Sequence, residues 1–322
     1  MSHVVVTGAA GFIGSHLVEA LVARGDEVVG VDNFDPFYPR PMKERNLAAL
    51  RGSPRFALHE VDILDAGRLA AVLTPESILV HLAAKAGVRP SLEDPLAYAR
   101  TNLAGTAAVL EAARRAGVSR IVFASSSSVY GDDTPSPFRE DAPALAPVSP
   151  YGATKRGGEL LLAAMAPLFG FRAAALRFFT VYGPRQRPDL AIHAFARRMA
   201  EGKPITLFGD GSNARDYTYC DDIVRGVVAA MDWTATAAVG MEIFNLGGSR
   251  PVALRDMVAE IARALGVEPR IEWAPLQPGD VRHTAADLTK SGRVLGYRPT
   301  TPFADGIRRF VAWFREVHER HA

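Results

Sequence analysis

Three glycines spaced by two residues each follow a short run of valines near the N-terminus. Residues 4–6 are valines, Gly8, Gly11 and Gly14 come next, and an amphipathic segment follows them. This order predicts a strand, a tight turn and the start of a helix. Glycines let a ligand approach the backbone, and the free N–H groups at a helix N-terminus favour negative charge. The stretch therefore predicts a binding site for a diphosphate.

The segments after the glycines complete a strand-helix-strand unit. A helix is expected over residues 15–24 and a second strand over 27–32. Asp32 closes this strand 24 residues after Gly8, where a dinucleotide-binding fold places the carboxylate that accepts hydrogen bonds from the adenosine ribose. The same carboxylate would repel a 2′-phosphate, so we expect NAD rather than NADP. The alternative is that Asp32 serves only as a helix cap or turn residue.

Strands and helices continue to alternate along the first half of the chain. We expect strands over 56–61, 77–82 and 119–125, and a helix over 97–116. This alternation predicts an α/β fold with a Rossmann-type, doubly wound parallel sheet that is covered by helices on both faces. Ligands of such sheets bind beyond the carboxyl ends of the strands. His81 lies inside an apolar strand, where histidine is more often a core residue, and we assign it no catalytic role.

Composition and charge limit the kinds of molecule that the chain is expected to bind. The chain has 322 residues, of which 48% are hydrophobic, and its 37 basic and 35 acidic residues are mixed along its length. We therefore expect a globular protein without a nucleic-acid or membrane partner. No basic leader or apolar run of about 20 residues is seen, and the single cysteine rules out an internal disulfide. We expect a cytoplasmic location and no metal.

A tyrosine and a lysine stand four residues apart at the start of a predicted helix. Tyr151 and Lys155 would share one helix face, and the strand before them ends in four serines at 125–128. A tyrosine has a pKa near 10 and is a poor base at neutral pH, but a nearby ammonium group and a nicotinamide cation would lower that pKa. The Ser126 hydroxyl could share the proton. Taken alone, however, a Tyr-x-x-x-Lys spacing is a frequent accident.

These motifs together resemble one enzyme family. The glycine motif, the Ser-Ser-Ser-Ser-Val-Tyr-Gly segment at 125–131 and Tyr151-x-x-x-Lys155 are similar to those of the extended short-chain dehydrogenase/reductases, in particular the NAD-dependent nucleotide-sugar epimerase/dehydratase group. The resemblance covers nearly the whole chain. It implies that Tyr151, Lys155, Ser126 and Ser127 form the catalytic site, with Ser127 lining the same pocket as Ser126.

The resemblance also implies a division of the chain and a cofactor site. Residues 1–176 would form the NAD-binding Rossmann domain. Residues 177–322 would form mainly a smaller C-terminal α/β lobe for the nucleotide sugar, with segments returning to the Rossmann domain. The resemblance further implies a homodimer built from the helix at 97–116 and the Tyr-Lys helix. The residues expected to contact NAD are Gly8, Gly11, Phe12, Ile13, Gly14, Asp32, Asn33, Asp62, Ile63, Leu82, Ala83, Ala84, Lys85, Tyr151 and Lys155.

Two departures from the family pattern limit which reaction the chain is expected to catalyse. Related dehydratases and decarboxylases have acidic residues where this chain has Ser127 and Ser128, and serine cannot ionise to do the same work. The resemblance therefore implies 4-epimerisation of a UDP-sugar through a transient 4-keto intermediate and enzyme-bound NADH. A net NAD-dependent oxidoreductase or a dehydratase remains the alternative reaction.

The substrate is expected to be UDP-glucuronate, converted to UDP-galacturonate. The segments 32–38 and 178–184, together with Gln277, look more like those of uronate epimerases. UDP-glucose and UDP-N-acetylglucosamine remain the alternatives. The stretch 176–189 is expected to leave a strand and become a basic, anion-binding loop, where Arg187 and Thr180 would fix the sugar carboxylate. The residues expected to bind substrate are Arg89, Ser126, Ser127, Thr180, Arg187, Phe208, Arg215, Gln277 and Asp280.

Overall fold

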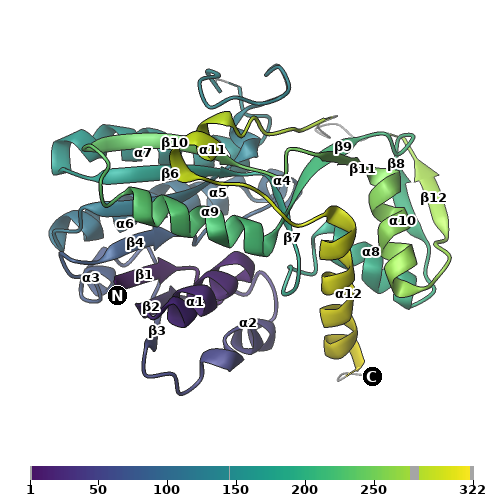
Figure 1. Cartoon of the computed structure of the whole chain (residues 1–322), viewed down its shortest axis with the longest axis horizontal. Coiled ribbons are helices and arrows are strands. Elements are labelled where there is room, and N and C mark those ends of the chain that lie inside the picture. Colours follow the sequence, from purple (N-terminus) through teal and green to yellow (C-terminus); the bar gives the residue numbers. More distant parts are fainter. Residues whose placement is uncertain (1, 145, 276–282, 320–322) are drawn as a thin grey trace.

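The computed structural model describes residues 2–144, 146–275 and 283–319, and its centre is a seven-stranded sheet (Figure 1). The strand order is β10-β6-β5-β4-β1-β2-β3, and all neighbouring strands run parallel. The strands are β1 (His3–Thr7), β2 (Glu27–Asp32), β3 (Phe56–Glu60), β4 (Ile78–His81), β5 (Arg120–Ser126), β6 (Arg172–Phe178) and β10 (Gly240–Leu246). The predicted Rossmann-type parallel sheet is confirmed.

Helices cover both faces of this sheet because its strands are apolar on both sides. Val4 and Val6 of β1 face one core, which α1 (Phe12–Arg24) and α9 (Cys220–Trp233) complete. Val5 faces the opposite core, which α3 (Ala66–Ala70), α6 (Gly105–Arg115) and α7 (Pro150–Phe169) complete. This alternation along one strand follows from the two-residue period of β structure.

Two segments from the second half of the chain belong to this large sheet. β10 pairs with β6 along its whole length and forms one edge of the sheet. Ile223, Val227 and Met231 of α9 join the same core as Leu17 and Leu21 of α1. The chain therefore returns to the large sheet after it has begun the smaller lobe.

The smaller lobe contains two short sheets and its own core (Figure 1). One sheet joins β7 (Thr180–Tyr182), β9 (Ala214–Tyr219) and β11 (Pro251–Ala253), and the other pairs β8 (Ile205–Phe208) with β12 (Ile271–Ala274). Helices α8 (Ala191–Ala200), α10 (Leu254–Leu265) and α12 (Phe303–Glu319) pack there. The predicted smaller α/β lobe is present. No described helix has the length and apolar character needed to cross a membrane.

The prediction of one helix over 97–116 is wrong in detail. The structure has α5 (Pro95–Tyr98), a π-helical turn over Ala99–Ala104, and then α6. Within the wider turn, the Asn102 side chain accepts a hydrogen bond from the Lys85 N–H at 2.8 Å and donates one to the Lys85 carbonyl at 2.9 Å. The π-helical turn thus fastens the loop after β4, as such turns often do near functional sites.

Candidate active site

A cavity lies beyond the carboxyl ends of β1, β2, β4 and β5, where the sheet topology predicts a ligand site. Residues from each sequence motif line it, although they are up to about 180 positions apart in the chain. The predicted site residues that line this cavity are Gly8, Gly11, Phe12, Ile13, Gly14, Asp32, Asn33, Ile63, Leu82, Ala83, Ala84, Lys85, Tyr151, Lys155 and Arg187.

The glycine turn has the geometry that a diphosphate requires. Gly8 has φ +74°, and a Cβ atom there would lie 2.8 Å from the Ala83 nitrogen. A Cβ at Gly14 would overlap the Gly8 carbonyl oxygen, so the turn and the helix could not approach each other. Gly11 is the N-cap of α1 and supplies no side-chain hydrogen bond to the first helical N–H groups. These donors border the cavity and fit an anionic ligand.

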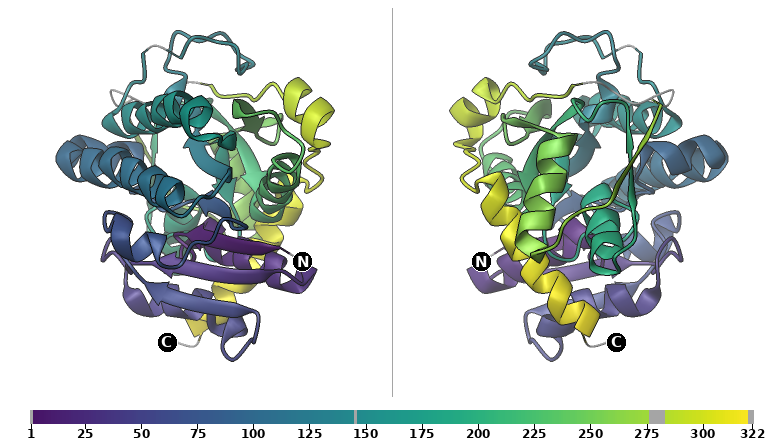
Figure 2. Two further views of the ribbon diagram at one scale, coloured as in Figure 1. Left: turned by 90° about the vertical axis from the view of Figure 1, so that its left-hand side faces the viewer. Right: turned by 90° about the vertical axis from the view of Figure 1, so that its right-hand side faces the viewer.

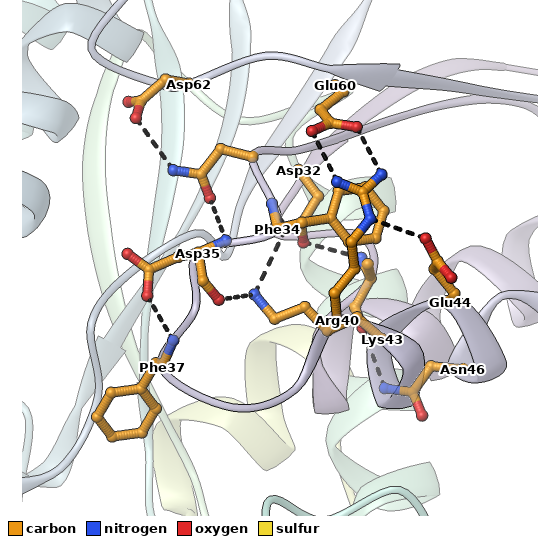
Figure 3. Close-up of polar contacts among 12 residues, drawn as sticks. Asp32, Phe34, Asp35, Phe37, Arg40, Lys43, Glu44, Asn46, Glu60 and Asp62 are labelled. Atoms are coloured by element: carbon orange, nitrogen blue, oxygen red, sulfur yellow. Dashed lines mark hydrogen bonds and ion pairs between the residues drawn. The ribbon is translucent and has the colours of Figure 1, made fainter.

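Asp32 both shapes a turn and lines the cavity (Figure 3). One carboxylate oxygen accepts a hydrogen bond from the Ala10 N–H at 3.0 Å, and the other accepts one from the Phe34 N–H at 2.8 Å. The turn role considered from the sequence is therefore met, and the ribose-binding role of Asp32 stays a prediction. Asn33 donates to Asp62 at 3.0 Å. Asp62 is not among the cavity-lining residues and supports Asn33 instead.

The Tyr-Lys pair lies on the first turns of α7 and faces the cavity. Ser149 caps this helix by accepting a hydrogen bond from the Gly152 N–H at 3.1 Å. Tyr151 forms a side-chain hydrogen bond with Ser126. The Lys155 ammonium donates to the Ala124 carbonyl at 2.7 Å. The end of β5 and the start of α7 therefore hold the three side chains together.

Burial dominates the ionisation of this group. It raises the pKa of Tyr151, whereas the hydrogen bond from Ser126 and the charge of Arg187 act in the opposite direction. Burial also lowers the pKa of Lys155 to about 8, and the charge of Glu159 opposes that change. The expected lowering of the Tyr151 pKa by Lys155 includes the effect of a bound nicotinamide cation, so it stays a prediction.

A buried ionic network lies behind the catalytic strand end. The carboxylate of Glu159 accepts two hydrogen bonds from Arg177, both at 2.9 Å, and one from Ser125 at 2.6 Å. Glu159 is fully buried, and Arg177 is 1% exposed. Arg156 adds a partly exposed ion pair to Glu159 at 2.8 Å. Because Ser125 lines the cavity, the network anchors the strand that carries Ser126.

The stretch 176–189 leaves a strand, β6, as predicted, but its arginines have different surroundings. Arg177 is part of β6 and pairs with Glu159, and Arg185 pairs with Glu19 at 2.7 Å. Only Arg187 lines the cavity. Its guanidinium donates to both Asp189 oxygens, at 3.0 and 2.8 Å, and lies 5.3 Å from the centre of the Phe37 ring. The three arginines have different surroundings because each forms an ion pair with a different carboxylate.

Apart from Arg187, none of the predicted substrate residues that the structure describes is among the residues that line the cavity. Arg89 of α4 (Val88–Glu93) lies 5.2 Å from the ring centre of Phe208, so the two lobes meet at these side chains. Ser127 begins the short helical turn Ser127–Val129, Thr180 begins β7, and Arg215 lies on β9. Gln277 and Asp280 fall outside the described residues.

His81 belongs to the core and not to the chemistry. It is 2% exposed, and its ring nitrogens form hydrogen bonds with the hydroxyls of Thr7 at 2.7 Å and Thr106 at 3.1 Å. Burial lowers the pKa of His81 to about 3. The side chain is thus a neutral link between β1, β4 and α6.

One group of potential metal ligands lies among the described residues. The donor atoms of His16, Cys220 and Asp221 lie within 4.8 Å of one another. His16 forms a hydrogen bond with the Pro184 carbonyl at 2.9 Å, and Cys220 donates to Asp221 at 3.6 Å. None of the three lines the cavity, and we assign no metal to them.

Sequence reasoning missed four cavity residues that follow Asp32. Asp35, Phe37, Tyr38 and Lys43 all line the cavity. The signal that could have found them is the cluster of aromatic and charged residues directly after Asp32. Asp35, Phe37 and Tyr38 belong to the loop that connects β2 to α2 (Arg40–Asn46), and Lys43 lies on α2. Figure 3 labels Asp35, Phe37 and Lys43.

A glycine turn at a helix N-terminus, an acidic residue that closes β2, and a Tyr-Lys helix on one cavity define a short-chain dehydrogenase/reductase type of enzyme. Residues 4–247 match the model of the NAD dependent epimerase/dehydratase family. The chain belongs to this family, so its cofactor is NAD, and the resemblance found in the sequence is confirmed.

Three relatives illustrate the similarity. A UDP-glucuronate 4-epimerase of Thermodesulfobacterium geofontis (strain OPF15) is 40% identical, over 98% of this chain and 97% of the relative. The crystal structure of UDP-glucuronic acid 4-epimerase from Bacillus cereus in complex with UDP-glucuronic acid and NAD is 37% identical, with a TM-score of 0.92 over 98% of this chain and 99% of that one. UDP-glucose 4-epimerase of Thermotoga maritima with UDP-glucose is 32% identical, with a TM-score of 0.88 over 98% and 99% of the two chains.

Proposed function

We propose that this chain is an NAD-dependent 4-epimerase that converts UDP-glucuronate to UDP-galacturonate. The observation that carries the proposal is one cavity that brings together Tyr151, Lys155 and Arg187. Full-length similarity to UDP-glucuronate 4-epimerases supports it. Tyr151 and Lys155 supply the acid-base chemistry, and Arg187 supplies the charge that a uronate requires.

Each side chain of the cavity has a separate role in the reaction at C4 of the sugar. Bound NAD supplies the hydride acceptor and donor, and its positively charged ring favours the phenolate form of Tyr151. Tyr151 removes the proton of the 4-hydroxyl group, and Ser126 donates a hydrogen bond to the same oxygen. Lys155 would hold the nicotinamide ribose of the bound cofactor. After the 4-keto sugar has turned in the cavity, Tyr151 returns the proton to the C4 oxygen as the hydride adds to the other face of C4, which gives the opposite epimer.

The serines after β5 support epimerisation over dehydration. Ser127 and Ser128 offer hydroxyl groups where a dehydratase needs ionisable groups to move protons at C5 and C6. An epimerase needs only one base and one hydride acceptor. The residues present therefore favour the simpler reaction.

A uronate presents a specific hazard that Arg187 can control. With a carboxylate at C5 and a ketone at C4, the intermediate is a β-keto acid, which loses CO2 when the breaking C–C bond aligns with the carbonyl π system. Arg187 can hold the carboxylate out of this alignment by charge-assisted hydrogen bonds, assisted by Thr180. Asp189, which accepts two hydrogen bonds from the guanidinium, fixes its orientation.

Replacing Arg187 by alanine should lower turnover of UDP-glucuronate by about 100-fold and release a UDP-4-keto-pentose, because the carboxylate is no longer held. Chromatography coupled to mass spectrometry separates these products. Arg185→Ala is the matched control, since Arg185 pairs with Glu19 outside the cavity, and it should give no keto pentose. Unchanged turnover of Arg187→Ala, without keto pentose, would disprove this role.

The substrate can be tested directly with purified protein. We expect the C4 epimer of UDP-glucuronate to form faster than the epimers of UDP-glucose or UDP-N-acetylglucosamine, with no net change in NADH absorbance. Accumulation of NADH would indicate an oxidoreductase, and a 4-keto-6-deoxy sugar would indicate a dehydratase. Faster turnover of UDP-glucose would move the assignment to the alternative substrate.

We also propose a homodimer and a cytoplasmic location, the latter because a single cysteine favours a reducing compartment. The helices α6 and α7 lie side by side on one face of the molecule (left view of Figure 2). Exposed leucines occur on α7 and on the two segments that pack against it, α5 and the π-helical turn, namely Leu96 (81% exposed), Leu103 (37%), Leu160 (55%) and Leu168 (74%). Such an apolar surface supports association with a second copy.

Leu160→Glu should convert this dimer to a monomer, because it would place a charge in the apolar contact. Light scattering after size-exclusion chromatography measures the mass. Val239→Glu is the control, since Val239 is equally exposed, at 56%, on another part of the surface. Equal masses for wild type and both variants would contradict this interface.

A further inference from the structure

The segment 33–39, between β2 and α2, is fixed by local contacts at the edge of the cavity (Figure 3). Phe34 adopts a left-handed conformation with φ 54°, which is unusual for a residue other than glycine. The Asp35 N–H donates to the Asn33 side chain at 3.0 Å, and the Lys43 ammonium donates to the Asp35 carbonyl at 2.9 Å. A strained turn that is held by so many contacts is typical of a functional segment.

Tyr38, in this segment, carries a buried hydroxyl group that the protein does not satisfy. The residue is 9% exposed and lines the cavity. Its hydroxyl has no hydrogen-bond partner among the described residues. Buried hydroxyl groups are nearly always paired, and an unpaired one destabilises a protein. A hydrogen-bond acceptor on a ligand would explain this hydroxyl.

The position and protonation of Tyr38 indicate which part of the ligand it meets. Asp32, at the end of the cavity where the adenosine is expected, lies 3.8 Å from the Lys43 ammonium, and the guanidinium of Arg187 lies 5.3 Å from the ring centre of Phe37, the residue before Tyr38. Between the two ends of a dinucleotide lies its diphosphate. The Lys43 ammonium lies 4.9 Å from the Tyr38 ring centre. Burial raises the pKa of Tyr38, so the hydroxyl stays protonated and can donate to an anionic oxygen.

An ion pair fastens the same segment to the opposite side of the cavity. Asp35 lies 3.2 Å from Lys85, which belongs to the loop after β4, and both residues line the cavity. The backbone of Lys85 is fixed by two hydrogen bonds to Asn102. The Phe37 ring centre lies 5.9 Å from the Lys85 ammonium and 5.3 Å from the Arg187 guanidinium. The segment thus contacts both the cofactor and the sugar ends of the cavity.

We propose that the segment 33–39 is a strap that retains bound NAD, in which the Tyr38 hydroxyl donates a hydrogen bond to a phosphate oxygen of the dinucleotide and the Asp35–Lys85 ion pair holds the strap in place. An epimerase must keep its cofactor between the two hydride transfers, and the strap serves this need. The inference rests on NAD binding and not on the choice of sugar.

The test uses purified full-length protein with its NAD removed, and it measures NAD affinity by titration calorimetry and the melting temperature by calorimetric scanning. Tyr38→Phe should raise the dissociation constant of NAD by about 10-fold to 100-fold, because a hydrogen bond to a charged oxygen is lost. The melting temperature of the NAD-free variant should not fall, because no partner within the protein is lost. Asp35→Asn should speed NAD release by about threefold, as expected for a partly exposed ion pair.

Two control variants distinguish this role from a structural one. Tyr297→Phe also removes a buried hydroxyl, but this one donates to the Gly247 carbonyl at 3.0 Å, so the variant should melt at a lower temperature and bind NAD normally. Glu242→Gln removes a surface ion pair with Lys290 and should not change NAD release.

The outcomes separate this inference from the proposed function. Equal NAD affinity of Tyr38→Phe and wild type, or a lower melting temperature of the NAD-free Tyr38→Phe variant without weaker NAD binding, would overturn the strap. Weaker NAD binding by Tyr38→Phe supports the strap even if UDP-glucuronate is not the substrate. Failure of the wild-type protein to bind NAD would overturn both.

Discussion

Tyr151→Phe should lower the turnover of UDP-glucuronate by about 1,000-fold or more while NAD stays bound. The variant keeps the ring but lacks the hydroxyl group that exchanges a proton with the sugar, and loss of a general base or acid typically costs about 10²-fold to 10⁴-fold in rate. Initial rates from chromatographic separation of the C4 epimers measure turnover. The nicotinamide content of the purified variant measures retention of the cofactor.

Tyr98→Phe is the matched control for this experiment. Tyr98 is the ring neighbour of Tyr151, with ring centres 6.2 Å apart, and its hydroxyl donates to the Ala86 carbonyl at 3.0 Å. Its removal should change turnover by less than about tenfold, since the hydroxyl has a structural partner. Full activity of Tyr151→Phe would end the proposal that this tyrosine is the base.

Glu159→Ala should lower the free energy of unfolding by about 3–5 kcal/mol, since removing one partner of a buried ion pair leaves the other charge uncompensated. Arg177 is 1% exposed, and two of its nitrogens depend on Glu159. Ser125 also loses its acceptor. Denaturant unfolding, followed by circular dichroism, measures the change.

Two further variants test whether the uncompensated charge is the cause. Arg156→Ala removes the partly exposed partner of Glu159 and should cost less than about 1 kcal/mol. The double variant Glu159→Leu with Arg177→Leu removes both charges and should recover most of the stability. A Glu159→Ala protein as stable as Arg156→Ala would contradict this account of the network.

The large sheet could be predicted because its signals are local. Strand 27–32 and the glycine turn are encoded by short runs of β-formers, glycines and apolar residues, and the structure has β2 over the same residues. The cavity could be predicted because parallel strands place their carboxyl ends at one edge. Gly8, Asp32 and Tyr151 are consequently brought together as the order of strands requires.

The parts that sequence could not predict depend on contacts between distant residues. Arg177 and Arg187 occur in one basic stretch, and only the fold shows that the first meets Glu159 and the second reaches the cavity. The π-helical turn depends on Asn102 meeting the Lys85 backbone. The unpaired hydroxyl of Tyr38 depends on how tightly its neighbours enclose it, which no local pattern records.

The return of α9 and β10 to the large sheet has a consequence for protein engineering. A fragment that ended at residue 176 would lack the edge strand that pairs with β6 and the helix that covers α1. Its apolar surface would then be open to water, and aggregation would be expected. A chimera with new sugar specificity would therefore need at least two crossover points, with residues 220–246 inherited together with the large sheet.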